Sequence, residues 1–196
     1  MCKLRYYYGS MNSMKSATLL MKAHQFEQSG CKVILMKPSV DIRDFGIIKS
    51  RPMESSRECI LIKPNDNIEN LVKTMLKFNN KKTIIFIDEV QFLTEQQVEQ
   101  LFFITEKYNV EVFTYGLKLS YKNELFKASE RLLVLADTVE EIKSMCKCGR
   151  KATTHLRFIN NKVVTKGQDF LVGDINGSEK YESVCQRCWH KQIKNK

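Results

Sequence analysis

One stretch of the sequence decides the fold, Gly9-Ser10-Met11-Asn12-Ser13-Met14-Lys15-Ser16. It nearly matches the phosphate-binding loop G-x-x-x-x-G-K-[S/T], in which backbone N–H groups and a helix N-terminus surround phosphate groups. Gly9, Lys15 and Ser16 are in register with this motif, whereas Met14 stands where the second glycine belongs. We therefore expect a phosphate site at residues 9–16, with weakened nucleotide binding or a local adjustment of the loop at Met14.

A second motif supports this prediction. Residues 84–89 read Ile-Ile-Phe-Ile-Asp-Glu, an apolar strand with an acidic end, at which Asp88 would hold Mg²⁺ directly or through water. Each motif alone is weak, because chance lysines follow many turns and many strands end in aspartate. Together, in the order strand, loop, helix and acidic strand, they predict a nucleotide-binding site.

The segments around the two motifs alternate between strand-like and helix-like patterns. Strands are expected at 3–8, 32–36, 59–62, 83–87, 110–114 and 132–135, and helices at 16–28, 67–78 and 95–108. The polar segment 41–58 has no clean period and is expected to form a strand plus a mobile loop. This alternation predicts an α/β fold, a P-loop NTPase-like parallel sheet flanked by helices on both faces. Ligands of such sheets bind beyond the carboxyl ends of the strands.

Composition narrows the class of protein. No run approaches the roughly 18 apolar residues of a membrane helix, and the N-terminus MCKLRYYYGS lacks the apolar core of a signal peptide. We therefore expect a cytoplasmic protein with no membrane partner. Of the net charge of +10, much lies in residues 146–196, which carry eleven Lys and Arg against four Asp and Glu. The hydrophobic patterning changes at the same point, which predicts a nucleotide-binding domain at 1–144, a small lobe at 145–190 and a disordered tail at 191–196.

Four of the seven cysteines form two close pairs, Cys146-Lys147-Cys148 and Cys185-Gln186-Arg187-Cys188. In a reducing compartment such spacings favour metal binding over disulfides. Four thiolates give a closed tetrahedral site, which is typical of structural zinc rather than catalytic zinc. A redox role for Cys185 and Cys188 is the alternative, and His190 is a candidate replacement ligand. We expect His24 and His155 to be surface or packing residues.

Five segments follow one another in an order that is specific to a family: GSMNSMKS at 9–16, DEVQF at 88–92, YGLKLSYKNELF at 115–126, CKCGRKA at 146–152 and YESVCQRC at 181–188. Over essentially the whole chain they resemble the zinc-containing thymidine kinases of the cytosolic cellular and bacterial type. The resemblance implies an enzyme of nucleotide salvage for DNA synthesis that phosphorylates the 5′-hydroxyl of thymidine or deoxyuridine. It implies ATP as the donor, Mg²⁺, a structural Zn²⁺ and a homotetramer, and it leaves open whether thymidine triphosphate is a feedback inhibitor. We expect no nucleic-acid partner.

The resemblance also assigns the catalytic and donor side of the site. Residues 9–16 would bind the phosphates of ATP, and the Mg²⁺ ligands would be Ser16 and Asp88. Glu89 would be the general base that accepts the proton of the 5′-hydroxyl, a role that suits a carboxylate beside the metal. Without the family, a solvated or N-cap carboxylate is the ordinary interpretation of Glu89.

The resemblance also assigns one acidic and one basic residue to the phosphate site. Asp41 and Arg43 match the family's D-x-R pattern after the second strand, where the pair contacts phosphate and metal. A surface salt bridge is the alternative interpretation of this pair. Arg51 is expected to face the phosphates as well.

The nucleoside side is assigned from the aromatic and apolar segments. Phe92 would stack on the thymine ring, and the resemblance implies as other pocket residues Met11, Leu117, Tyr121, Phe126 and Tyr181. Segment 162–181 resembles a lasso loop whose backbone groups bind the edge of the base and so exclude other bases. This chain departs from the family there, because Asp174-Ile175-Asn176-Gly177 keeps only one glycine of the usual pair.

Two other functions fit the same residues. One is an inactive or regulatory relative that still binds nucleoside but has lost phosphoryl transfer through Met14. The other is a P-loop ATPase whose basic zinc lobe binds nucleic acid, which the scattered basic residues and few aromatics of the tail disfavour. The leading prediction is a thymidine kinase, in which catalysis consists of positioning, charge neutralisation by Mg²⁺ and Lys15, and proton removal by Glu89.

Overall fold

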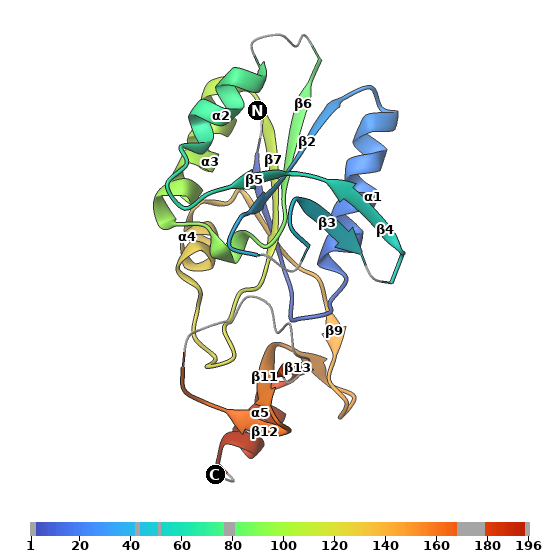
Figure 1. Ribbon diagram of the computed structural model, residues 1–196, viewed down its shortest axis with the longest axis vertical. Helices are drawn as coiled ribbons and strands as arrows, with labels where there is room; N and C mark the ends of the chain where they lie inside the picture. Colours follow the sequence, from blue (N-terminus) through green and yellow to red (C-terminus); the bar gives the residue numbers. More distant parts are fainter. Residues whose placement is uncertain (1–2, 42–43, 51, 77–80, 168–178, 195–196) are drawn as a thin grey trace.

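The computed structural model describes residues 3–41, 44–50, 52–76, 81–167 and 179–194, and its centre is a six-stranded sheet (Figure 1). The strands lie in the order β5-β2-β6-β7-β1-β8, and every neighbouring pair is parallel. Their bounds are β1 (Leu4–Tyr8), β2 (Lys32–Pro38), β5 (Ile60–Ile62), β6 (Thr83–Ile87), β7 (Glu111–Gly116) and β8 (Thr138–Glu141). Strand β1 lies between β7 and β8, so the loop that follows it starts inside the sheet rather than at its margin.

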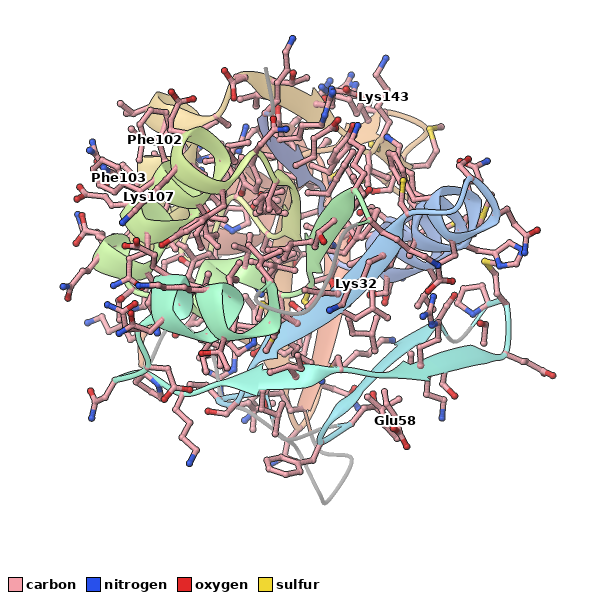
Figure 2. The ribbon with its side chains drawn as sticks, turned by 90° about the horizontal axis from the view of Figure 1, so that it is seen from above. Lys32, Glu58, Phe102, Phe103, Lys107 and Lys143 are labelled. Carbon is pink, nitrogen blue, oxygen red and sulfur yellow. The ribbon has the colours of Figure 1, made fainter. Side chains whose placement is uncertain are left out.

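Helices cover both faces of this sheet, as the sequence pattern predicts. One face carries α2 (Ile68–Leu76), α3 (Glu95–Tyr108) and α4 (Lys127–Leu135), and the other carries α1 (Lys15–Gln28) with the hairpin of β3 (Ile47–Ser50) and β4 (Ser55–Glu58). Figure 2 shows the same layers from above, with Phe102 and Phe103 on the outer helix α3. Within the described residues, no helix is both long enough and apolar enough to cross a lipid bilayer.

Each face of the sheet has its own apolar core. On the α1 side, Leu19 and Ala23 pack with Phe86 of β6, and on the other side Val98 and Leu101 of α3 pack with the alternate strand residues. All five residues of β6 are buried, which is expected of a central parallel strand that is covered on both faces. The cores therefore fix the position of the carboxyl end of β6, where the acidic motif lies.

Three parts of the domain differ from the sequence prediction. The apolar run 132–135, expected as a strand, is the last turn of α4, because Ala128 and Leu132 are buried one helical turn apart against the core. The edge strand is β8 instead, which the sequence pattern did not indicate. Segment 41–58, expected to be a strand plus a mobile loop, contains the antiparallel hairpin β3–β4 in its described residues.

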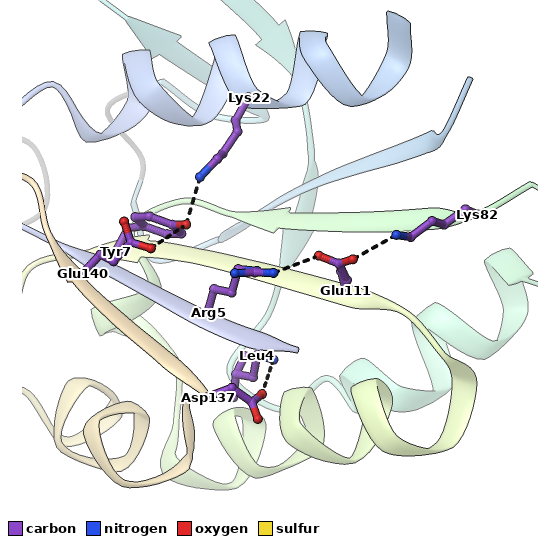
Figure 3. A network of polar contacts seen from close by, with 8 residues as sticks. All are labelled: Leu4, Arg5, Tyr7, Lys22, Lys82, Glu111, Asp137 and Glu140. Atoms are coloured by element: carbon purple, nitrogen blue, oxygen red, sulfur yellow. Dashed lines mark hydrogen bonds and ion pairs between the residues drawn. The ribbon is translucent and has the colours of Figure 1, made fainter. Parts of the chain in front are cut away.

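Polar contacts fix the edge strand β8 to β1 (Figure 3). The backbone N–H of Leu4 donates to Asp137 Oδ2 at 2.8 Å, just before β8 begins. The hydroxyl of Tyr7 accepts from Lys22 Nζ at 2.9 Å and donates to Glu140 Oε1 at 3.3 Å, which joins β1, α1 and β8. The Leu4 contact holds the start of β1, and the Tyr7 contacts hold its end, from which the phosphate loop departs.

The C-terminal lobe lies beyond the carboxyl ends of the sheet strands. It contains the strand pair β9 (Ser144–Met145) and β10 (Lys151–Ala152), the sheet β12-β11-β13, and helix α5 (Gln186–Lys194). The bounds of its three-stranded sheet are β11 (Thr154–Ile159), β12 (Lys162–Val164) and β13 (Glu179–Val184). Because α5 extends to Lys194, the expectation of a disordered tail is wrong for 191–194, and residues 195–196 lie outside the described part of the chain.

Candidate active site

The phosphate loop spans the gap between β1 and α1. Gly9 is required there, because a Cβ atom at this position would lie 2.2 Å from Ser13 Oγ and 2.6 Å from the Ile142 carbonyl oxygen. Lys15 is buried, and its Nζ donates to the carbonyl of Ser10 at 2.8 Å and to Ser13 Oγ at 3.4 Å. The ammonium group is thus held over the loop, where it can reach phosphate oxygens.

Met14 adopts a backbone conformation that favours glycine. Its φ and ψ are 65° and 24°, in the left-handed region, and it is the N-cap of α1. A non-glycine residue in this region costs about 1–2 kcal/mol. The side chain is 52% exposed, so it is not packed into the loop and stands at the rim of the cavity described below. The structural consequence of Met14 in this loop is therefore backbone strain at a residue whose side chain is largely exposed.

The acidic end of β6 meets the start of α1. Ser16 Oγ donates to Asp88 Oδ2 at 2.7 Å, and the backbone N–H of Glu89 donates to Asp88 Oδ1 at 3.0 Å. Burial, and next the charge of Glu89, raise the pKa of Asp88 to about 6, against the hydrogen bond from Ser16 and the charge of Lys15. A hydroxyl and a carboxylate side by side are oxygen ligands of the kind that Mg²⁺ prefers. The residues present therefore fit the expected metal.

Glu89 is oriented by a neighbour that the sequence reasoning missed. Its φ is 51°, and its Oε2 accepts from Gln91 Nε2 at 2.6 Å. Gln91 is 4% exposed, and its Oε1 accepts from the backbone N–H of Leu117 at 2.9 Å. A Cβ at Gly116 would lie 2.5 Å from Gln91 Oε1, so the glycine at the end of β7 makes room for this amide. The carboxylate of Glu89 is thereby held at the junction of β6 and β7.

A buried ion pair forms another wall. Lys37 Nζ lies 3.1 Å from Asp41 Oδ2, with both side chains 4% exposed, and it also donates to the carbonyl of Asp44 at 3.0 Å. The predicted Asp41 is therefore paired inside the molecule rather than in a surface salt bridge. Lys37 was missed, although a lysine within the apolar run that precedes Pro38 was a signal for it. The two arginines predicted nearby, Arg43 and Arg51, lie outside the described residues.

These groups line one cavity of about 330 Å³. The predicted site residues that line it are Met11, Asn12, Ser13, Met14, Lys15, Ser16, Asp41, Asp88, Glu89, Phe92, Leu117, Phe126 and Tyr181. Gly9 and Ser10 shape the loop behind this cavity, and Tyr121 is buried next to it without lining it. The lining also contains His155, which we expected to be a surface or packing residue.

An aromatic pair and a leucine held by hydrogen bonds form another part of the cavity lining. The rings of Phe92 and Phe126 meet edge to face, with centroids 6.1 Å apart. The carbonyl of Leu117 accepts from Ser129 Oγ at 2.6 Å and from the hydroxyl of Tyr6 at 3.1 Å. The wall is therefore rigid and apolar, which suits a flat heterocycle.

The lobe contributes Tyr181 through a buried charge network. Arg157 Nε and the hydroxyl of Tyr181, the latter at 2.6 Å, both donate to Glu179 Oε1. The guanidinium of Arg157 also lies over the ring of Tyr121, 5.2 Å from its centroid. Because Arg157 and Glu179 are 3% and 6% exposed, their charges compensate each other inside the protein.

Further hydrogen bonds attach the lobe to the loop before α4. Trp189 Nε1 donates to the carbonyl of Tyr121 at 3.0 Å. The side-chain amides of Asn123 and Gln186 exchange two hydrogen bonds, at 3.0 and 2.8 Å. Helix α5 of the lobe is therefore bound to the segment that carries the apolar wall of the cavity.

The four paired cysteines come together in the lobe. Their sulfur atoms all lie within 4.8 Å of one another, and Cys148 Sγ is 3.4 Å from Cys146 Sγ and 3.6 Å from Cys185 Sγ. A tetrahedron with Zn–S bonds of ~2.3 Å needs S···S distances of roughly 3.8 Å, so the cluster fits zinc. A hydrogen bond from the backbone N–H of Cys188 is the largest of the effects that lower the pKa of the Cys185 thiol to about 6. This lowered pKa favours a thiolate. His190 is exposed and is not part of the cluster.

The chain is similar in sequence to one family of known proteins. The family model described as "Thymidine kinase" matches residues 2–189. A thymidine kinase of Streptococcus pyogenes serotype M3 is 39% identical over 189 residues, which are 95% of this chain and 96% of that protein. A thymidine kinase of Legionella pneumophila (strain Lens) is 37% identical over 188 residues, 95% of this chain and 88% of that protein.

A solved structure supports the fold independently. This structure, described as an ATPase domain, superposes with a TM-score of 0.54 at 15% sequence identity. The match covers 91% of this chain and 80% of that chain. At this identity the likeness concerns the fold alone, and it agrees with a P-loop NTPase-like sheet.

Proposed function

The chain belongs to the thymidine kinase family, and from this premise we propose that it transfers the γ-phosphoryl group of ATP to the 5′-hydroxyl of thymidine or deoxyuridine. One observation carries the proposal. A single cavity contains a phosphate loop with a buried lysine, an acidic strand end, and an apolar wall of aromatic residues. Such a cavity suits an anionic donor on one side and a nucleoside on the other.

On the donor side, the chain's own groups bind and orient phosphate. Lys15 Nζ now pairs with loop oxygens of Ser10 and Ser13, and phosphate oxygens can replace these partners with stronger, charge-assisted hydrogen bonds. The backbone N–H groups at the start of α1 add to the same field. Ser16 and Asp88 would hold Mg²⁺, which supplies charge neutralisation on the phosphates.

On the acceptor side, Glu89 acts as the general base. In the transfer step, the 5′-oxygen forms a bond to the γ-phosphorus while the bond from that phosphorus to the bridging oxygen breaks, and ADP leaves with the electron pair. The proton of the 5′-hydroxyl goes to Glu89. Gln91 restrains one carboxylate oxygen at 2.6 Å and so orients the carboxylate that accepts this proton.

The nucleoside is bound between the two parts of the chain. Phe92 would stack on the base, Phe126 and Leu117 would border it, and Tyr181 would contact the sugar. Tyr121 would support this wall without contacting the nucleoside, because it is 1% exposed. Its ring packs against the guanidinium of Arg157. This division supports a nucleotide-binding domain at 1–144 and a lobe at 145–190 that closes the site.

Zinc in the four-cysteine cluster would be structural in this proposal. All four ligand positions are supplied by thiols, so no position is left for a reacting group. The remaining parts of the proposal rest on the family resemblance alone. They are a homotetramer, thymidine triphosphate as a feedback inhibitor, and action in the cytoplasm.

A transfer assay with thymidine, ATP and Mg²⁺ tests the proposal. The wild-type protein should form thymidine monophosphate and ADP in equal amounts. Glu89→Gln should lower kcat about 100- to 10,000-fold while leaving the affinity for ADP nearly unchanged. Glu106→Gln, at an exposed glutamate of α3, is the matched control and should leave kcat unchanged. Equal loss of ADP affinity and turnover in Glu89→Gln would show that Glu89 is structural.

The backbone strain at Met14 favours one alternative, the inactive relative. In that case thymidine would raise the melting temperature of the protein, but no thymidine monophosphate would form even at high ATP concentration. Restoration of transfer by Met14→Gly would then assign the loss to this residue. Salt-sensitive DNA binding without stabilisation by thymidine would indicate the nucleic-acid-binding ATPase instead.

A further inference from the structure

His155 projects from the lobe toward the phosphate loop. Strands β11 and β13 are antiparallel, with His155 opposite Ser183 and Arg157 opposite Tyr181, and directly opposed residues project to the same face of a sheet. Ser183 Oγ on this face donates to the carbonyl of Met11 in the phosphate loop. The face that carries His155 is therefore the one that the lobe presents to the nucleotide-binding domain.

The imidazole of His155 is buried but has no hydrogen-bond partner in the described part of the protein. The residue is 3% exposed, and its ring meets the ring of Tyr181 edge to face, with centroids 5.7 Å apart. Among the residues that the structure describes, none donates to or accepts from its ring nitrogens. The ring nitrogens are not among the fully buried polar atoms that lack a partner, and the residue lines the cavity, so they are available to a ligand bound there.

The surroundings of His155 show which part of a ligand it would meet. It lines the main cavity together with Lys15 and Tyr181, and it also borders a small cavity beside Gly9 and Ser10. Burial first, and the positive charge of Lys15 second, lower the pKa of His155 to about 4. At neutral pH its ring is therefore uncharged, with one N–H donor and one acceptor nitrogen.

We propose that His155 is a further catalytic residue, whose ring N–H donates a hydrogen bond to an oxygen of the γ-phosphoryl group. This inference rests on the proposed function. His155 lines the same cavity as Lys15, which would hold the donor phosphates, and its ring meets Tyr181, which the proposed function places at the sugar. We therefore place it where the phosphoryl group would pass to the 5′-hydroxyl. His155 neither gains nor loses a proton in this role; it stabilises charge on the group in transit.

A packing role is the competing explanation, since the ring of His155 contacts Tyr181. Two substitutions separate the two roles. His155→Phe keeps a ring against Tyr181 but removes the N–H, whereas His155→Asn loses the ring but keeps an N–H donor of similar reach. If His155 binds phosphate, the asparagine variant is the more active one; if it only packs, the phenylalanine variant is.

The experiment compares three ligands by calorimetry: ADP, the β,γ-imido analogue of ATP and thymidine. His155→Phe should weaken binding of the analogue roughly 10- to 100-fold, the value of a hydrogen bond to a charged group, with ADP and thymidine nearly unchanged. The kcat of this variant should fall by a similar factor, and His155→Asn should recover most of both. His24→Asn, at an exposed histidine of α1, is the control and should behave as the wild type.

Equal weakening of ADP and of the analogue, or lower activity for His155→Asn than for His155→Phe, would overturn the proposal. A selective loss of thymidine affinity would also overturn it and would assign His155 to the sugar. If His155→Phe does not fold, His155→Ala is used for the same comparison of ADP with the analogue. Should the wild type form no thymidine monophosphate, the proposed function fails, but the difference between ADP and the analogue still decides the role of His155.

Discussion

The nucleotide-binding domain and the C-terminal lobe hold their site residues in different ways. In the domain, Lys15, Asp88 and Glu89 lie at the ends of elements that two apolar cores fix on either side of the sheet. The core of the lobe is small, and its buried members are Ala152, Leu156, Val163 and Val184 with two of the clustered cysteines. The domain can therefore position its half of the site by hydrophobic packing alone, whereas the lobe depends on the cysteine cluster.

This difference predicts that removal of the metal disrupts the lobe's half of the site and leaves the domain's half intact. Because a structural zinc site contributes its binding free energy to folding, a chelator should unfold the lobe and abolish thymidine binding and turnover. ADP affinity should stay within a few-fold of the untreated protein, since the phosphate loop belongs to the other core. Calorimetry with each ligand, before and after chelation, measures this.

Cys185→Ser should reproduce the effect of the chelator, and Cys31→Ser, at a cysteine outside the cluster, should not. Loss of ADP binding together with thymidine binding would contradict the comparison, because it would mean that the domain also needs the lobe in order to fold. Unchanged thymidine affinity after complete chelation would argue against a metal in the cluster.

Asp88→Asn tests how much stability the folded domain loses because the charged carboxylate of Asp88 is buried. Turnover should fall at least ~100-fold, because the carboxylate that would hold Mg²⁺ is lost. The apo protein should nevertheless become more stable above pH 6, by about 1–3 kcal/mol. Asparagine can keep both local hydrogen bonds, with its amide donating to Ser16 and its carbonyl accepting from the N–H of Glu89.

The sign of the pH dependence follows from the pKa of Asp88, about 6 in the folded protein and ~3.9 in an unfolded chain. Between these values the unfolded chain loses its proton first, so the wild type loses stability as the pH rises from about 4 to 6. The gain from Asp88→Asn should therefore be small near pH 4 and full above pH 6. Chemical denaturation at several pH values measures it, and a gain that does not grow with pH would show that the buried charge carries no cost.

The sequence predicts the elements that carry the domain's half of the site, for the same reason that packing positions these elements. Strands such as Thr83–Ile87 are buried on both faces and have a clear apolar signature, and the phosphate loop and acidic motif are tied to strand ends. The run 132–135 was misassigned because a short apolar run fits a strand or a buried helical turn equally well. Only the tertiary contacts of Leu132 decide between them.

The lobe's half was harder to predict. His155, Arg157 and Glu179 lie in short strands with mixed polar residues, and their importance depends on which face of the β11–β13 pair meets the domain. No local pattern carries that information, since it comes from the pairing register and from contacts such as Trp189 with the Tyr121 carbonyl. The cysteine pairs were recognisable because metal ligation needs only their spacing.

Arg157→Met probes the charge network that holds Tyr181. It leaves the carboxylate of Glu179 buried without its cation, a change that costs about 3–5 kcal/mol in buried pairs. We expect the KM for thymidine to rise roughly 10- to 100-fold while the KM for ATP changes little. The double variant Arg157→Met, Glu179→Gln removes both charges and should recover part of the loss. Lys162→Met, at an exposed residue of β12, is the matched control, and an equal rise in both KM values would contradict a lobe-specific role.

Met14→Gly should have the smallest effect of these substitutions, and the effect should be confined to the domain's half of the site. Glycine adopts a φ of 65° without strain, so the substitution should stabilise the folded loop by about 1 kcal/mol. That gain is partly offset by the greater freedom of glycine in the unfolded chain. The KM for ATP should fall a few-fold with the KM for thymidine unchanged, measured by steady-state kinetics. A larger effect on thymidine than on ATP would mean that the half-exposed side chain of Met14 contacts the nucleoside, and the division of the site between the two parts of the chain would then be incomplete at this rim.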